Sequence, residues 1–169
     1  MGGGNWSARG PIMGALVMAL AGFPAKEVTA QSRGGASDSA KIVAVLNAAL
    51  AAQERNDEKA LDTLYAAETL TIIEGASINR GWTDFWEHHL GPELKDMKDL
   101  QFKAANVEVS VSGNTAWAIF SFTKKYQSPT RAVDNIGRGT AIFERIKGRW
   151  VIRHYQDAGR ARRPTDPPA

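Results

Sequence analysis

The residue best suited to exchanging protons near neutral pH is His154, one of three histidines among 169 residues. It lies in an alternating stretch near the end of the chain, where a period of two puts it on the same strand face as Trp150 and Ile152. If those two residues face the core, His154 and Gln156 line a pocket, and His154 could act there as a general acid or base. The alternative is a histidine that is hydrogen-bonded within the core or a dimer interface.

His88, His89 and Glu93 form a second group that could carry chemistry. His89 and Glu93 are four residues apart, a spacing that puts two metal ligands on one helical face. Gly91-Pro92 lies between them and is expected to disrupt that geometry, and adjacent histidines point about 100° apart on a helix. We therefore predict no metal ion here and treat His89 as a polar ligand contact. The alternative is one exposed and one packed histidine.

Other side chains could complete a ligand site. Glu74 could be a pocket carboxylate that assists catalysis, or it could cap the turn that begins at Gly75. Arg138 could bind an anion bidentately if it faces inward, whereas an outward arginine would be solvated or interfacial. Trp86 and Trp117 could form the apolar wall of a pocket or belong to the core. Such a site suits a small apolar or weakly anionic molecule, and no motif predicts a cofactor.

The elements that must position these side chains follow from the spacing of apolar residues. Helical spacing begins after Asp38 or Ser39 and again after Asp57, each of which can cap a helix. A third helix starts with Thr83 as its cap and should break or bend at Gly91-Pro92. Strand patterns cover residues 70–74, 102–111, 115–126, 132–146 and 149–157, with a turn over 75–81. This order predicts an α+β fold in which three helical segments cover one face of a curved, mostly antiparallel sheet.

The two ends of the sequence are expected to lie outside this domain. Residues 1–30 resemble a signal peptide, with Arg9 before the apolar run Ile12–Phe23 and Ala30 at the cleavage position. That run would span about 18 Å as a helix, which is too short for a bilayer. We therefore expect a secreted or periplasmic protein that does not contact the membrane after cleavage. A flexible lead-in over 31–37 and a disordered tail over 158–169 complete this organisation.

Composition excludes several classes of function. The net charge of +3 arises at the ends, because residues 38–157 hold 15 Lys and Arg against 16 Asp and Glu. A nucleic-acid-binding protein needs a basic face on its folded body, so nucleic acid is not an expected partner. The absence of cysteine excludes disulfides, thiolate metal sites and a cysteine nucleophile.

The order of elements and several local strings resemble the nuclear transport factor 2-like superfamily, in particular its SnoaL-like and ketosteroid isomerase-related domains. The matching strings are Arg55-Asn56-Asp57, Leu64-Tyr65-Ala66, Gly137-Arg138-Gly139-Thr140 and residues 148–155. The resemblance covers residues 38–157. It implies a cone-shaped, cystatin-like roll with a pocket between helices and sheet, and commonly a homodimer formed through the sheet. It does not imply one function, because this fold serves enzymes and binding domains alike.

The resemblance does not extend to the isomerase machinery. Ketosteroid isomerase uses a carboxylate base and two hydrogen-bond donors to an oxyanion, and the corresponding positions here are Ile73, Ala49 and Ile142. We therefore expect an exported, homodimeric domain that binds a small, mostly apolar molecule. One alternative is an isomerase, dehydratase or hydrolase that uses His154 as acid or base, with Glu74 or Arg138 in support. Another is a dimerisation module without chemistry.

Overall fold

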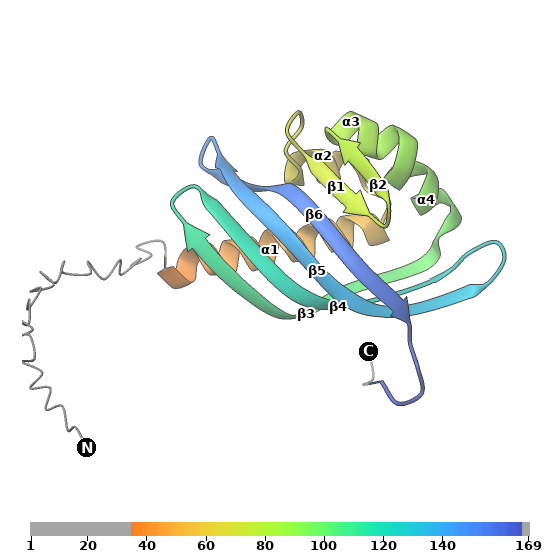
Figure 1. Ribbon diagram of the computed structural model, residues 1–169. Coiled ribbons are helices and arrows are strands. Elements are labelled where there is room, and N and C mark those ends of the chain that lie inside the picture. The colour runs from red at the N-terminus through yellow and green to blue at the C-terminus, as the bar shows by residue number, and fades with distance from the viewer. Residues whose placement is uncertain (1–34, 167–169) are drawn as a thin grey trace, which may run out of the picture.

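The computed structural model describes residues 35–166, which form three helical segments and one six-stranded sheet (Figure 1). The predicted signal peptide, residues 1–30, lies outside the described residues, as do residues 31–34 of the predicted lead-in. None of the helices within residues 35–166 is long and apolar enough to cross a membrane.

The helices are α1 (Gly35–Glu54), α2 (Glu58–Leu64), α3 (Trp82–Phe85), a π-helical turn η1 (Trp86–Leu90) and α4 (Gly91–Asp96). The predicted cap of α2 is confirmed, because the Asp57 carboxylate accepts a hydrogen bond from the Ala60 backbone N–H at 3.1 Å. The other two predicted starts are wrong. Helix α1 begins upstream of Asp38, and α3 begins after Gly81 without the Thr83 cap.

Asp38 holds α1 against the sheet instead of capping it. Its carboxylate pairs with the Arg145 guanidinium and accepts a hydrogen bond from the Trp150 indole N–H at 3.5 Å. The Lys41 ammonium, 3.2 Å away, and the Arg145 guanidinium hold the pKa of Asp38 below its ordinary value. This contact fixes the first turn of α1 over the β5–β6 hairpin.

The strands are β1 (Thr71–Glu74), β2 (Ser77–Arg80), β3 (Lys98–Ser112), β4 (Thr115–Gln127), β5 (Ala132–Ile146) and β6 (Arg149–Ala161). Their order across the sheet is β2-β1-β6-β5-β4-β3, and only the β1–β6 pair is parallel. The predicted α+β class and mostly antiparallel sheet are confirmed. Residues 75–81, predicted as a turn, contain β2, because Gly75 at φ +57° closes a two-residue hairpin turn.

The helices cover one face of the sheet, and small residues of β4 and β5 are among those buried on that face (Figure 1). Ala116, Ala118 and Ala141 are fully buried, as are Ile42 and Leu46 of α1. Small side chains let the helix approach the strands closely. The larger neighbours of these alanines must then point to the opposite, outward face.

A bulge in β6 decides which residues of that strand face the helices. Phe143 of β5 pairs with Ile152, but the adjacent Ile142 pairs with His154, so Arg153 is an extra residue in β6. A bulge of this kind adds one residue to one strand only. The alternation of inward and outward side chains therefore restarts after Arg153.

The bulge reverses the predicted orientation of the side chains that follow Arg153 in β6. Trp150 faces the core as expected and is 6% exposed. After the bulge the inward positions belong to Tyr155 and Asp157, whose cross-strand partners on β5 are Ala141 and Gly139. His154 and Gln156 point outward, so neither lines the interior of the cone.

Strand β6 also continues past its predicted end. It runs to Ala161, so the tail expected to be disordered from residue 158 begins as a strand. The Arg160 guanidinium then contacts both carboxylate oxygens of Asp166, at 2.6 and 2.8 Å, and the Arg163 N–H donates to Asp166 at 2.6 Å. These bonds fold residues 163–166 back against the end of β6.

Candidate functional site

The third helical segment continues through Gly91-Pro92, so the predicted break is absent. The Gly91 N–H donates to the Trp86 carbonyl five residues earlier, and Pro92, which has no N–H to donate, follows it at the start of α4. A Cβ atom at position 91 would lie 2.7 Å from the Trp86 carbonyl oxygen, so this turn requires glycine. His89 lies in the π turn and Glu93 four residues later, on the same face of the segment, and such turns are frequent at functional sites.

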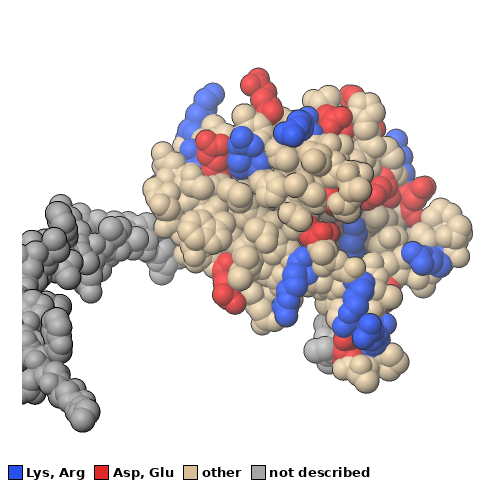
Figure 2. Space-filling model, viewed as in Figure 1, with Lys and Arg blue, Asp and Glu red and all other residues tan. Residues whose placement is uncertain are grey.

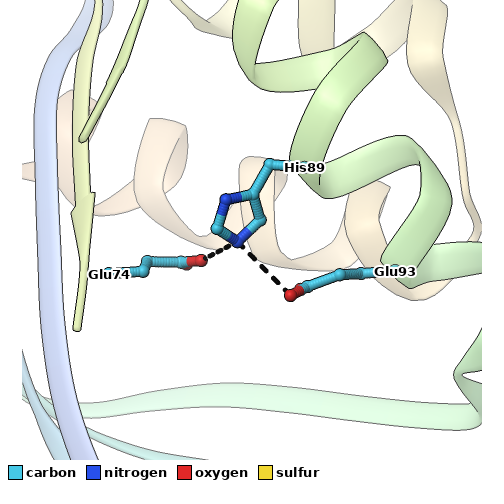
Figure 3. A group of neighbouring side chains, drawn as sticks. All are labelled: Glu74, His89 and Glu93. Atoms are coloured by element: carbon cyan, nitrogen blue, oxygen red, sulfur yellow. Dashed lines mark ion pairs between the residues drawn. The ribbon is translucent and has the colours of Figure 1, made fainter. Parts of the chain in front are cut away.

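Glu74 at the end of β1 meets these two side chains (Figure 3). Nε2 of His89 lies 2.6 Å from Oε2 of Glu74 and 3.3 Å from Oε1 of Glu93. The side chains of His89 and Glu74 are 17% and 27% exposed, so solvent still reaches them. We call Glu74, His89 and Glu93 the carboxylate–histidine cluster.

Hydrogen bonding fixes the proton on the other ring nitrogen of His89. The Asn79 amide nitrogen donates to Asp84 at 3.3 Å, which turns the Asn79 amide oxygen toward Nδ1 of His89 at 3.0 Å. An amide oxygen can only accept, so Nδ1 carries the proton. Nε2 then either donates to Glu74 as part of an imidazolium or accepts from a protonated Glu74. In both states one proton is shared between His89 and Glu74.

The surroundings of Glu74 favour its protonated form. Burial raises the pKa of Glu74, and the carboxylates of Asp157 and Glu93 act in the same direction. The Lys124 ammonium and the His89 ring oppose that shift of the Glu74 pKa. Glu74 therefore holds a proton more readily than an exposed glutamate does, which suits an acid–base role near neutral pH.

A second inward carboxyl lies beside Glu74. Asp157 is the direct partner of Glu74 across the parallel β1–β6 pair, and its Oδ2 accepts a hydrogen bond from the Tyr155 hydroxyl at 3.0 Å. Burial raises the pKa of Asp157, whereas the Tyr155 hydrogen bond and the Lys124 ammonium lower it. Lys124 itself lies on the inward face of β4, over the Phe102 ring at 5.2 Å.

Aromatic side chains adjoin the cluster on the helical side. Trp82 stacks on Tyr65 at 5.3 Å between ring centroids and on Trp86 at 5.5 Å, and Phe85 lies 5.6 Å from the His89 ring. Trp86, predicted as a pocket wall, belongs to this group and is partly exposed. The polar cluster thus has an apolar surface next to it.

Glu74, His89 and Glu93 are also residues that could hold a metal ion, since one donor atom of each lies within 4.8 Å of the others. Ligands that share one zinc ion at about 2.0–2.2 Å stand about 3 Å or more from each other. Nε2 of His89 and Oε2 of Glu74 are only 2.6 Å apart, which is the distance of a direct ion-pair contact. With the Lys124 ammonium also nearby, the observed geometry fits a shared proton better than a metal ion.

The predicted site residues divide between the two faces of the sheet. Glu74 and His89 come together inside the cone, as a ligand site requires. Trp117, His154 and Gln156 point outward, so their predicted places inside are wrong, and Arg138 takes the outward of its two alternatives.

Sequence reasoning missed Asn79, Lys124, Tyr155 and Asp157 as interior polar residues, and it set aside Glu93. The alternation of β6 did contain the signal for Tyr155 and Asp157. These residues face inward because the inward and outward positions exchange at the bulge. For Glu93 the four-residue spacing to His89 was the correct signal, and the glycine and proline between them obscured it.

A SnoaL-like domain model matches residues 42–157. Among solved structures, a candidate ketosteroid isomerase from Shewanella frigidimarina is 20% identical, covers 68% of this chain and 92% of its own, and has a TM-score of 0.62. A candidate dehydratase of the nuclear transport factor 2-like family from Streptomyces avermitilis is 18% identical, with coverages of 72% and 94% and a TM-score of 0.65.

A protein with a cystatin-like fold from Caulobacter vibrioides is 18% identical, with coverages of 73% and 89% and a TM-score of 0.63. No curated protein is similar enough in sequence to count as a relative. Identities this low establish the fold alone, whereas the domain model spans more than half of the sequence. The chain therefore belongs to the SnoaL-like domain family, and it shares its fold with solved structures named as nuclear transport factor 2-like.

Proposed function

We propose that this chain is an enzyme that moves a proton on a small organic substrate, as isomerases and dehydratases do. The observation that carries the proposal is the contact of 2.6 Å between His89 Nε2 and Glu74 Oε2, with His89 Nδ1 held by Asn79. The printed names of two structures of the same fold, a candidate ketosteroid isomerase and a candidate dehydratase, are in keeping with it.

The roles follow from the positions of the side chains. When His89 is an imidazolium and Glu74 a carboxylate, the Glu74 carboxylate takes a proton from a carbon next to a carbonyl group. The electron pair of the broken C–H bond moves onto the carbonyl oxygen. Lys124 and the protonated form of Asp157 are the inward groups able to donate a hydrogen bond to that oxygen. Return of the proton to another carbon completes an isomerisation; loss of a β-hydroxyl group with the proton, as water, completes a dehydration.

The substrate class follows from the neighbours of the pair. Trp86, which stacks on the buried Trp82 and is partly exposed, offers an apolar surface to the rest of the substrate. Three carboxyl groups, those of Glu74, Glu93 and Asp157, stand against one ammonium group, so a neutral carbonyl compound fits this interior better than an anion. His154 has no part in this reaction because it points away from the cone.

We also propose that two copies pair through the outward face of the sheet. Trp117 pairs with Ile142 across β4 and β5, and these side chains and Ile119 are 46%, 36% and 47% exposed. Apolar side chains gathered on one face of a sheet usually mark an interaction surface. Export to the periplasm or medium remains a proposal that rests on the features of residues 1–30.

Solvent deuterium uptake tests the proton transfer before the natural substrate is known. The purified protein is incubated in D₂O with β,γ-unsaturated ketones and β-hydroxy ketones, together with any small molecule that mass spectrometry finds retained by it. Enolisation introduces deuterium next to the carbonyl even where no net product forms. The wild type should accelerate this uptake, and His89→Gln and Glu74→Gln should slow it by about 10²- to 10⁴-fold.

His88 provides the matched control, because it is the adjacent histidine and contacts Asp84 at 3.4 Å on the exposed side. His88→Gln should exchange deuterium at the wild-type rate. A retained compound whose exchange is the same in wild type and His89→Gln would make this a binding domain without chemistry. Equal losses in His88→Gln and His89→Gln would show that the assigned pair is not the source of the activity.

A further inference from the structure

A hollow of about 610 Å³ opens on the outward face of the sheet, away from α1 and from the carboxylate–histidine cluster. Two cross-strand rows of side chains line it: Ser121, Arg138 and Ala158, then Thr123, Ile136 and Arg160. Arg162 stands at its rim. The volume falls in the range of sites for small organic ligands.

This part of the outward face is basic, whereas the part around Trp117 is apolar. Figure 2, which looks onto the outward face, shows uncharged surface over the middle of the strands and Lys and Arg gathered toward the end of β6. Arg138, Arg160, Arg162 and the neighbouring Lys125 supply four positive charges. The acidic partners here are Asp134 and Asp166, which leaves a net charge of +2.

The arginines differ in whether their guanidinium groups already have an acidic partner. Both carboxylate oxygens of Asp166 hold Arg160, and Nε of Arg162 donates to Asp134 at 3.0 Å. Arg138 is exposed and makes no ion pair or hydrogen bond with a side chain in the part of the chain that the structure describes. Its guanidinium is therefore the group in the hollow that can take a new anion.

The two arginines that have acidic partners fix the shape of the hollow. Arg160 and Arg162 are anchored at their ends by Asp166 and Asp134, so the rim is set before any ligand arrives. Between the charges, Ile136 and Ala158 offer apolar surface. A carboxylate pairs bidentately with a guanidinium, and an apolar ring or chain attached to it would cover these two side chains.

We propose that this hollow binds a small organic anion, a carboxylate on an apolar ring or chain, with Arg138 as its ion-pair partner. The site is separate from the proton-transfer cluster and does not depend on it. A second copy of the chain is the competing occupant. A two-fold contact centred on the hollow would bring the arginines of both copies together, and such like-charge pairs oppose association.

Isothermal titration calorimetry with 1-naphthoate as the probe tests the proposal on the whole protein. The wild type should bind one 1-naphthoate per chain. Arg138→Gln should weaken that binding by about 10- to 100-fold, because a charge-assisted bidentate pair is lost. Arg138→Lys keeps the charge without the fork and should fall between the two. The neutral analogue 1-naphthamide should bind the wild type as weakly as 1-naphthoate binds Arg138→Gln.

Arg131→Gln is the matched control. Arg131 is exposed in the loop before β5 and outside the hollow, and its replacement by glutamine changes the net charge by the same amount as Arg138→Gln. It should bind 1-naphthoate like the wild type. Equal affinity of Arg138→Gln and wild type, or equal affinity for 1-naphthoate and 1-naphthamide, would overturn the proposal. So would a failure of the wild type to bind 1-naphthoate, or sedimentation showing that Arg138→Gln alters self-association and not 1-naphthoate binding.

Discussion

Replacing Gly91 with alanine should destabilise the protein, although the same change stabilises most helices. In an ordinary helix interior, alanine is preferred to glycine by about 0.5–1 kcal/mol. At position 91 a Cβ atom would lie 2.7 Å from the Trp86 carbonyl oxygen and 3.2 Å from Cε2 of its ring. Neither atom moves freely, because the carbonyl accepts the Gly91 N–H and the ring stacks on Trp82.

The expected loss of stability is the steric cost of the added Cβ atom minus the gain from the higher helical preference of alanine. Forcing an extra carbon into a closely packed site costs about 1–3 kcal/mol, and the helical preference of alanine offsets part of it. A net loss of about 1–2 kcal/mol lowers the melting temperature of a domain of this size by roughly 3–10 °C. Scanning calorimetry of Gly91→Ala against wild type measures it, with Lys95→Ala in α4 as a control for a tolerated helical substitution.

The same variant tests the link between the π turn and the site. If the turn relaxes to an α-helix, His89 moves by one residue in helical phase, about 100°, and leaves Glu74. Deuterium uptake should then be slower in Gly91→Ala than in wild type, in addition to the lower melting temperature of the variant. A Gly91→Ala protein that is as stable as wild type or more so would refute the steric argument, and retained activity in a destabilised variant would refute the link to His89.

The other predictions concern Asp157 and the outward face. Folding raises the pKa of Asp157 above its unfolded value of about 3.9, so its carboxyl contributes most to stability below that pH and loses this contribution as pH rises through the folded pKa. Asp157→Asn keeps an acceptor for the Tyr155 hydroxyl. Urea unfolding should show this variant to be more stable than wild type at pH 7 and equally stable near pH 3. A variant less stable than wild type at pH 7 would mean that the Lys124 ammonium fully compensates the charge of the Asp157 carboxylate. Trp117→Ser should weaken dimerisation by about 2 kcal/mol or more in sedimentation equilibrium, with Lys147→Ser unchanged; a wild-type protein that is monomeric at high concentration would contradict the proposed pairing.

Local patterns were enough for the elements and their class. The alternation over 132–146 predicted β5 with its observed bounds, and Asp57 predicted the cap of α2, because strand alternation and capping depend on residues adjacent in sequence. The strings around Gly137 and Trp150 predicted a SnoaL-like domain, which the domain model confirms. The inward position of Trp150 was also correct.

The sequence by itself determined the fold class and most of the helices and strands, although β2 and the end of β6 were not predicted. The tertiary structure decided which side chains share an interior: one extra residue at Arg153 exchanged His154 for Tyr155, and the helical segment that contains the π turn brought His89 to Glu74 of β1. Each insertion shifts the phase of every residue that follows, and it is stabilised by contacts with elements distant in sequence, such as β5 and Trp82. Periodicity read along the chain does not show where such a shift occurs.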